Sequence, residues 1–293
     1  MYRYTILCLL IISAGAFDGE IPLDRILHGG SASAVPAQCD LSIVSWNIER
    51  GLQLSGVTKA LKQMQPAVIL LQEVDLGAKR TGRVNIAEQL ARSLEMTYLF
   101  AIEFEEHGQG SRSHPAYQGQ AILTALPVSS PRIIRFKNQS GFWKPRWYIP
   151  NWALFQRRAG GRLALAAELA IGERRIVIYN LHLESRGSEE LRLRQTEELL
   201  SDVSRYPQDM PILIAGDFNT RHSDPPAVKA LLQAGFRKAA GQEITTTHGS
   251  VLDWIFVRGP LSPMNATVHR QVKASDHFPL SIKIRNETPD CRP

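Results

Sequence analysis

The sequence predicts one α/β domain in which β-sheets and helices pack in layers. Short apolar runs with strand character alternate with helical patterns along the chain, and no segment resembles a linker between domains. Several of these apolar runs are nearly continuous, which is typical of strands that are covered on both faces. The chain has 293 residues and is 44% hydrophobic. This size suits one large domain or two small ones, and the missing linker favours one.

The individual elements follow from the same patterns. Strands are expected at 41–48, 67–74, 120–126, 162–171, 174–183, 211–218, 251–259 and 279–285, and helices at 55–65, 84–95, 188–204 and 225–235. In the second helix, apolar residues from Val84 to Leu94 recur at helical spacing. The last helix is expected to begin at Asp224-Pro225-Pro226, because Asp caps a helix and proline suits its first turn.

The N-terminal residues have the pattern of a secretory signal peptide. Arg3 precedes an apolar run from Ile6 to Ile12, and Ala14-Gly15-Ala16 matches the small-x-small cleavage pattern. We therefore expect a signal peptide at 1–16 and a secreted or periplasmic protein, with an uncleaved N-terminal anchor as the alternative. Residues 17–38 are rich in Gly, Ser and Pro and predict a flexible lead-in, so the domain is expected to span 39–293.

Polar residues stand at the ends of the predicted strands or directly before the next one. A strand-end Asn or Asp usually caps a turn, and a single His is more often structural than functional. Six such positions in one chain instead indicate one polar cluster at one edge of a sheet sandwich. They are Trp46-Asn47, Gln72-Glu73, Asn180-Leu181-His182, Asp217-Phe218-Asn219, Asp253 and Ser275-Asp276-His277.

The order of these motifs, WN, QE, NLH, GDFN, LDWIF and SDH, resembles the endonuclease/exonuclease/phosphatase superfamily of metal-dependent phosphodiesterases. The resemblance runs from about Leu41 to Ile284, and GDFN together with SDH is its specific part. It implies a deoxyribonuclease-like, four-layer α/β/β/α sandwich of two mixed β-sheets flanked by helices. The active site would then lie at one edge, between loops from both halves of the chain.

The resemblance also implies a metal site. Glu73 is expected to be the main carboxylate ligand of a divalent cation, with Asn47 and Asp276 beside it, directly or through water. Mg²⁺ suits such a site because it takes few protein carboxylates and keeps several waters; Mn²⁺ is the alternative.

The other motif residues are expected to handle protons and the phosphate. Asp217 would orient and deprotonate the attacking water, and Asn219 would hold the phosphate or the water in line. His277, paired with Asp253, would donate a proton or stabilise charge, and His182 would contact a phosphoryl oxygen or the leaving group. Which of Asp217 and the Asp253–His277 pair is the base stays open at this point.

Two cysteines, Cys39 and Cys291, remain after removal of a signal peptide. An even pair in an exported chain suggests a disulfide. The family arrangement implies the same bond, because the first and last strands would lie together with these residues at their far ends.

Residues 131–162 contain eight basic side chains and no acidic one, with aromatic residues between them. This composition suits a nucleic-acid backbone with stacked bases, an anionic membrane surface, or an insertion that only packs on the sandwich. Trp143, Arg146 and Trp147 are the candidate substrate contacts in this segment.

Two further candidates lie elsewhere in the chain. Arg80 follows Glu73 closely and could bind a phosphate with two donors, unless it lies in a solvated loop. The family usually has Asn where this chain has Gln120, which leaves the role of Gln120 open.

Taken together, the sequence predicts a monomeric, divalent-metal-dependent hydrolase of a phosphoester, with nucleic acid favoured over lipid as the substrate. A nuclease-like phosphodiesterase is the first reading, and a sphingomyelinase-like lipid phosphodiesterase or phosphoinositide-type phosphatase is the alternative. A non-catalytic module that binds polyanions or membranes is opposed by the presence of Glu73, Asp217, Asn219 and His277.

Overall fold

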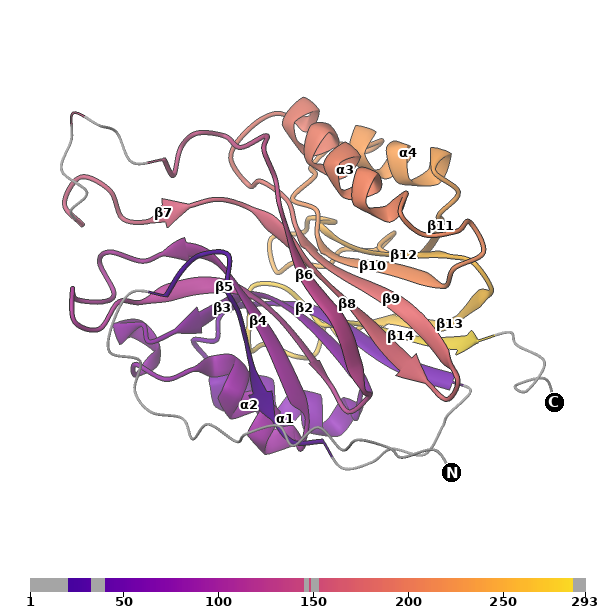
Figure 1. Cartoon of the computed structure of the whole chain (residues 1–293), viewed down its shortest axis with the longest axis horizontal. Coiled ribbons are helices and arrows are strands. Elements are labelled where there is room, and N and C mark those ends of the chain that lie inside the picture. The colour runs from indigo at the N-terminus through magenta and orange to yellow at the C-terminus, as the bar shows by residue number, and fades with distance from the viewer. Residues whose placement is uncertain (1–20, 33–39, 145–147, 149–152, 287–293) are drawn as a thin grey trace, which may run out of the picture.

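Two β-sheets face each other at the centre of the molecule, and helices cover their outer faces (Figure 1). The computed structural model describes residues 21–32, 40–144, 148 and 153–286. The helices are α1 (Leu54–Met64) and α2 (Ile86–Leu94) on one sheet, and α3 (Glu189–Val203) and α4 (Pro226–Gln233) on the other. The predicted four-layer α/β/β/α sandwich is therefore confirmed.

The first sheet has eight strands. They are β1 (Ile26–Gly30), β2 (Asp40–Arg50), β3 (Val68–Leu76), β4 (Thr97–Glu105), β5 (Tyr117–Thr124), β7 (Ala159–Gly160), β13 (Leu261–Val268) and β14 (Leu280–Asn286). Their order is β1-β4-β5-β3-β2-β14-β13, with β7 paired to β4. Only β2 and β3 are parallel neighbours, so the sheet is mixed.

The second sheet has six strands. They are β6 (Val128–Arg135), β8 (Leu163–Ile171), β9 (Arg174–His182), β10 (Ile212–Asp217), β11 (Arg237–Ala240) and β12 (Asp253–Arg258). Their order is β11-β12-β10-β9-β8-β6, and β9 and β10 are the parallel pair.

Strand β10 shows why its sequence is a continuous apolar run. Leu213 and Ala215 point toward the first sheet, and Ile212 and Ile214 point toward α3 and α4. Successive side chains of a strand alternate between the two faces of a sheet, so a strand in the middle of four layers must be apolar on both. The same alternation directs Asp217, the last residue of the strand, into the space between the sheets.

Local signals define the helix ends. Asn85 caps α2 by accepting the backbone N–H of Glu88 at 3.2 Å. Ser188 caps α3 in the same way through Leu191, also at 3.2 Å. A side chain that satisfies a free N–H at the start of a helix stabilises it by about 1 kcal/mol. The four predicted helix ranges agree with the observed ones to within a few residues.

The prediction of a flexible lead-in at 17–38 is wrong in part. Residues 26–30 form β1, which pairs with β4 and buries Leu27. Gly30 adopts φ +81°, and a Cβ there would lie 2.3 Å from the carbonyl oxygen of Met96. The glycines that suggested a loose segment instead allow close approach of two strands.

Several predictions fall on residues that the structure does not describe. The signal peptide at 1–16, the Cys39–Cys291 disulfide and the contacts of Arg146 and Trp147 all lie outside the described residues, so they stay predictions. Within the described part of the chain, no helix has the length and apolar character needed to cross a bilayer.

Candidate active site

Strand register brings three predicted residues of the second sheet together. Asp217 on β10 lies opposite His182 on β9 and opposite Asp253 on β12. Residues directly opposite each other in neighbouring strands project to the same face of the sheet. All three side chains therefore point between the two sheets, and all three are buried.

The first sheet contributes the facing residues. Asn47 on β2 lies opposite Gln72 on β3. The Asn47 Nδ2 donates to Asp217 Oδ2 at 3.1 Å, and Gln72 Nε2 donates to Asn180 Oδ1 at 2.7 Å. These two hydrogen bonds join the sheets at the edge where their shared apolar core ends.

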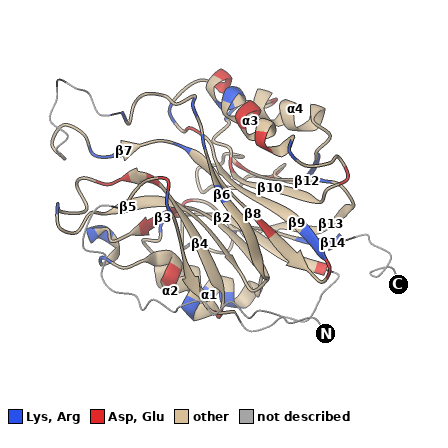
Figure 2. Ribbon diagram, viewed as in Figure 1, with Lys and Arg blue, Asp and Glu red and all other residues tan. Residues whose placement is uncertain are grey.

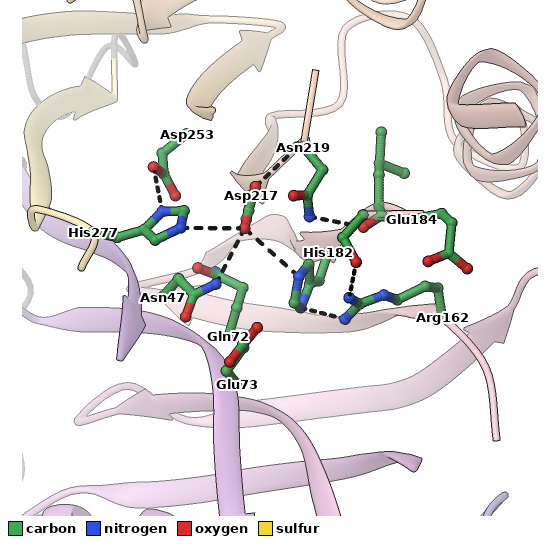
Figure 3. Close-up of polar contacts among 12 residues, drawn as sticks. Asn47, Gln72, Glu73, Arg162, His182, Glu184, Asp217, Asn219, Asp253 and His277 are labelled. Carbon is green, nitrogen blue, oxygen red and sulfur yellow. Dashed lines mark hydrogen bonds and ion pairs between the residues drawn. The ribbon is translucent and has the colours of Figure 1, made fainter. Parts of the chain in front are cut away.

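Asp217 occupies the centre of this cluster (Figure 3). Its Oδ1 accepts the backbone N–H of Asn219 at 2.8 Å. Its Oδ2 lies 3.6 Å from His182 Nε2 and 3.8 Å from His277 Nε2. The Asp217 carboxylate is thus surrounded by the imidazoles of His182 and His277 and by the Asn47 amide. This arrangement is suited to moving a proton between a small molecule and the protein.

His277 lies between two carboxylates. Its Nδ1 is 2.8 Å from Asp253 Oδ2, and its backbone carbonyl accepts the indole N–H of Trp46 at 2.8 Å. Burial lowers the pKa of His277, but the charges of Asp253 and Asp217 outweigh that effect and raise its pKa to about 10. The ring is therefore an imidazolium at neutral pH, with an N–H directed at Asp217.

His182 is held by two residues that the sequence analysis did not single out. Arg162 Nη1 lies 2.8 Å from His182 Nδ1 and 3.1 Å from Glu103 Oε2. Because a guanidinium only donates, the contact with Arg162 favours the tautomer in which His182 Nδ1 accepts and Nε2 carries the proton. That N–H points at Asp217. Glu103 is an acid within an apolar strand, which is the signal that could have identified it.

Glu73 faces the open side of the cluster. Its Oε2 lies 3.3 Å from Arg50 Nη2 and accepts Gln118 Nε2 at 3.3 Å. Burial raises the pKa of Glu73, but the positive charge of Arg50, reinforced by other nearby cations, lowers it to about 2. Its backbone has φ +51°, a conformation that non-glycine residues adopt rarely and that recurs at active sites as well as at helix ends.

The Gly-Asp-Phe-Asn turn explains the abrupt end of β10. A Cβ at Gly216 would lie 1.8 Å from the carbonyl oxygen of Leu181 on the parallel strand, so only glycine fits before Asp217. Asn219 then turns back with φ +51° and donates its side-chain N–H to the carbonyl of Leu183 at 3.1 Å. Its Oδ1 is left to face the cluster.

The third predicted metal ligand, Asp276, lies next to the cluster and is half-buried. Its Oδ1 accepts the hydroxyl of Ser275 at 3.2 Å, and that hydroxyl also reaches the carbonyl of Asn47 at 2.7 Å. Among the described residues, the acid and His side chains grouped closely enough to share one ion are a different set. Asp217, Asp253 and His277 offer ligand atoms within 4.8 Å of one another.

The predicted substrate contacts have different surroundings. Arg80, in the 3₁₀ helix η1 (Lys79–Thr81), binds Asp75 with two donors at 2.7 Å and Glu106 with a third at 3.1 Å. Gln120 is fully buried and donates to Glu103 and to the carbonyl of Leu163. These contacts favour a role for Gln120 in supporting Glu103, and its contact with a substrate stays a prediction.

A cavity of about 950 Å³ opens beside Glu73 and includes Trp143. Its charged side chains are seven basic residues and two acidic ones, and Figure 2 shows basic residues on both sides of β7, close to this region. The basic residues are Arg50, Arg80, Lys144, Arg157, Arg158, Arg162 and Arg186, and the acidic ones are Glu73 and Glu106.

Comparison with known proteins gives one family. The sequence model of the Endonuclease/Exonuclease/phosphatase family matches residues 44–277 of this chain. A search of curated proteins found no match.

Solved structures agree in fold. The human Nocturnin catalytic domain with a bound sulfate anion has a TM-score of 0.63 and 18% identity, over 85% of this chain and 96% of that chain. An endonuclease/exonuclease/phosphatase from Beutenbergia cavernae has a TM-score of 0.62 and 17% identity, over 84% and 72%. A humanized D. rerio TDP2 has a TM-score of 0.60 and 19% identity, over 84% and 99%. At these identities the likeness establishes the fold alone.

Proposed function

Because the chain belongs to the Endonuclease/Exonuclease/phosphatase family, whose members generally hydrolyse phosphoester bonds, we propose that it is a divalent-metal-dependent phosphodiesterase of the nuclease type. In this proposal an activated water attacks the phosphorus in line with the leaving oxygen. One observation carries it. The Asp217 carboxylate lies between the imidazoles of His182 and His277, and the ionised Glu73 lines the cavity on the open side of this cluster.

The donor set on that side fits a hard divalent cation. Glu73 is ionised and its side chain is 18% exposed, and Asn47, which lies opposite the neighbouring residue Gln72, carries an amide oxygen. Carboxylate and amide oxygens are ligands that Mg²⁺ accepts while keeping waters for exchange. We propose that Glu73 holds Mg²⁺ with help from Asn47 and Asp276, Mn²⁺ being the alternative. The bound ion would neutralise negative charge on the phosphate oxygens.

The group formed by Asp217, Asp253 and His277 suits proton handling better than metal binding. A protonated imidazole has no free lone pair, and the pKa of His277 is raised to about 10. His277 therefore acts as a proton donor to the leaving oxygen or as a fixed positive charge beside the phosphate. This assignment leaves Asp217 as the group that accepts a proton from the attacking water.

The remaining residues orient the reacting groups. Asn219 Oδ1 can accept an O–H of the water that Asp217 deprotonates, because its Nδ2 is already used by the Leu183 carbonyl. His182 directs its Nε2–H into the site and can bind a phosphoryl oxygen. Such groups lower the barrier because they are fixed before the charge develops.

The decisive experiment is hydrolysis by the full chain in Mg²⁺ or in EDTA. Plasmid DNA, single-stranded RNA, phospholipid vesicles and bis(p-nitrophenyl) phosphate would be compared, with Asp217→Asn as the blank. We expect cleavage of the small diester and of nucleic acid that needs Mg²⁺ and is absent from the blank. Hydrolysis that survives EDTA, or that the blank retains, would contradict the proposal, and release from lipid alone would assign the alternative substrate class.

The rate should also depend on pH in a specific direction. If the active form contains protonated His277, kcat/KM falls on the alkaline side of the profile as pH rises through about 10. Asp253→Asn removes one of the two carboxylates that raise the pKa of His277. The alkaline limb of the profile, where kcat/KM falls, should therefore shift to a pH about 1–3 units lower. A pH–rate profile on the small diester, with circular dichroism at each pH, measures it. A limb at the same pH in both proteins would contradict the role of His277.

A further inference from the structure

The cavity beside Glu73 contains more positive charge than the protein itself neutralises. Four of its seven basic residues are paired with acids: Arg50 with Glu73, Arg80 with Asp75 and Glu106, Arg158 with Glu106, and Arg162 with Glu103. The other three, Lys144, Arg157 and Arg186, have no carboxylate partner among the described residues. An unpaired group of cations around one cavity attracts an anionic ligand.

Arginine guanidiniums and aromatic rings form one continuous series of contacts that begins in the wall of this cavity, with Phe142 and Trp143 meeting edge to face and Phe104 buried behind the wall. Neighbouring members lie 4.4–5.2 Å apart. The arginine–aromatic stack consists of Arg186, Phe142, Trp143, Arg158, Phe104 and Arg162, in that order. Its inner end is Arg162, which contacts His182 at 2.8 Å. The stack therefore leads from the outer cavity to the residues around Asp217.

We propose that this cavity binds a nucleotide adjacent to the scissile phosphate of a single-stranded nucleic acid, with its base against Phe142 and its phosphate at Arg186 and Lys144. The inference rests on the proposed function, because it names the substrate class of the same site. It goes further in assigning a binding subsite to Phe142, Lys144 and Arg186, the last of which lies in another part of the chain.

The shape and lining of the cavity favour a nucleotide over a lipid surface. The cations and rings line a concave space of about 950 Å³ next to Glu73, which a flat bilayer surface does not enter. Phe142 is 55% exposed although Arg186 and Trp143 contact it, so part of its ring is open to a base. A base can stack there only when it is not already stacked within a duplex, which favours a single strand.

Phe142 and Arg186, at the outer end of the arginine–aromatic stack, can be substituted without disturbing the position of Trp143 in the cavity wall. Trp143 is held through its backbone carbonyl, which accepts Gln156 Nε2 at 3.0 Å and Gly160 N–H at 3.3 Å. Phe142 and Arg186 are both exposed and make no side-chain hydrogen bond among the described residues. Variants at these two positions therefore test binding rather than folding.

The test measures two quantities on the full chain. The first is the Kd of a labelled single-stranded oligonucleotide in EDTA, where the proposed hydrolysis does not run, by fluorescence anisotropy at several salt concentrations. The second is kcat/KM for bis(p-nitrophenyl) phosphate in Mg²⁺. We compare Phe142→Ala, Arg186→Gln and the control Arg92→Gln, which removes the same charge from an exposed residue of α2.

We expect Phe142→Ala to weaken oligonucleotide binding about ten-fold or more, the usual effect of losing one base–aromatic stack. Arg186→Gln should weaken it as well and reduce the slope of log Kd against log salt by about 0.7, the value for one phosphate contact on a single strand. The control should bind the oligonucleotide and hydrolyse the small diester like the parent protein, and the two cavity variants should lose more oligonucleotide affinity than kcat/KM for the small diester.

Unchanged Kd values in both cavity variants would overturn the proposal, as would an equal loss in the control. Weaker binding of anionic phospholipid vesicles with unchanged oligonucleotide binding would replace it with a lipid contact. A parent protein that does not hydrolyse the small diester would instead contradict the proposed function, and the Kd values would still decide whether the cavity binds a strand.

Discussion

Asp217→Asn is expected to lower kcat on a small phosphodiester by about 10²–10⁴-fold, the usual contribution of a group that transfers a proton in the transition state. The substitution keeps the size of the side chain but removes the negative charge that would accept a proton from water. Both carboxylate oxygens are acceptors, one from the Asn219 N–H and one from the Asn47 amide. No other carboxylate in the cluster lies between the two imidazoles.

The fold of this variant should persist. An amide oxygen at position 217 can still accept the Asn219 N–H, whereas the hydrogen bond with Asn47 is lost because the Asn47 oxygen already accepts the Glu49 N–H. The expected result is therefore a large fall in kcat with nearly unchanged KM, in a variant that still folds but unfolds at a lower temperature. A folded variant that keeps its activity would show that Asp217 is not the proton acceptor.

Much of the fold could be predicted because its patterns are local. Eight strands and four helices follow from apolar runs and helical spacing, since a strand covered on both faces must be apolar throughout. The strands that this reasoning missed carry weaker patterns. β4 contains Glu103, which interrupts an apolar run because it faces Arg162 inside the sandwich. Strands β6 and β13 are exposed over part of their length.

The central residues of the site were predictable because they stand at the ends of strong strands. Asp217, His182 and Asp253 end or begin neighbouring strands in one register, so finding the strands also finds their polar ends. Only part of the arginine–aromatic stack could be predicted from the sequence. The composition of 131–162 indicated cations and rings, but Arg186 and Phe104 join them only through tertiary packing.

The supporting residues could not be identified from sequence for the same reason. Gln118 lies between two charged residues of distant segments: its Nε2 donates to Glu73 at 3.3 Å, and its Oε1 accepts Arg158 Nη1 at 2.9 Å. A glutamine within an apolar strand carries no local sign of such a role. Gln120 lies two residues further along β5 on the same face and donates to Glu103, a contact that the sequence does not indicate either.

Glu73→Gln should have the second large effect, and it should act through the metal. Glutamine keeps the shape of the side chain but lacks the charge that Glu73 carries at neutral pH, where its lowered pKa of about 2 keeps it ionised. Because even the loss of a residue that only supports a ligand costs about 10–100-fold in metal affinity, the Mg²⁺ concentration for half-maximal rate should rise about 100-fold or more. The rate at saturating Mg²⁺ should fall as well.

A second variant separates metal binding from a purely structural role of Glu73. Arg50 lies 3.3 Å from the Glu73 carboxylate and competes with any cation there, so Arg50→Gln should lower the half-saturating Mg²⁺ concentration. If Glu73 served only to hold Arg50, the two variants would instead share one phenotype, with neither changing the Mg²⁺ titration. Titrations of rate and of thermal unfolding temperature against Mg²⁺ in both variants decide between these roles, because opposite shifts arise only when the ion and Arg50 share one carboxylate.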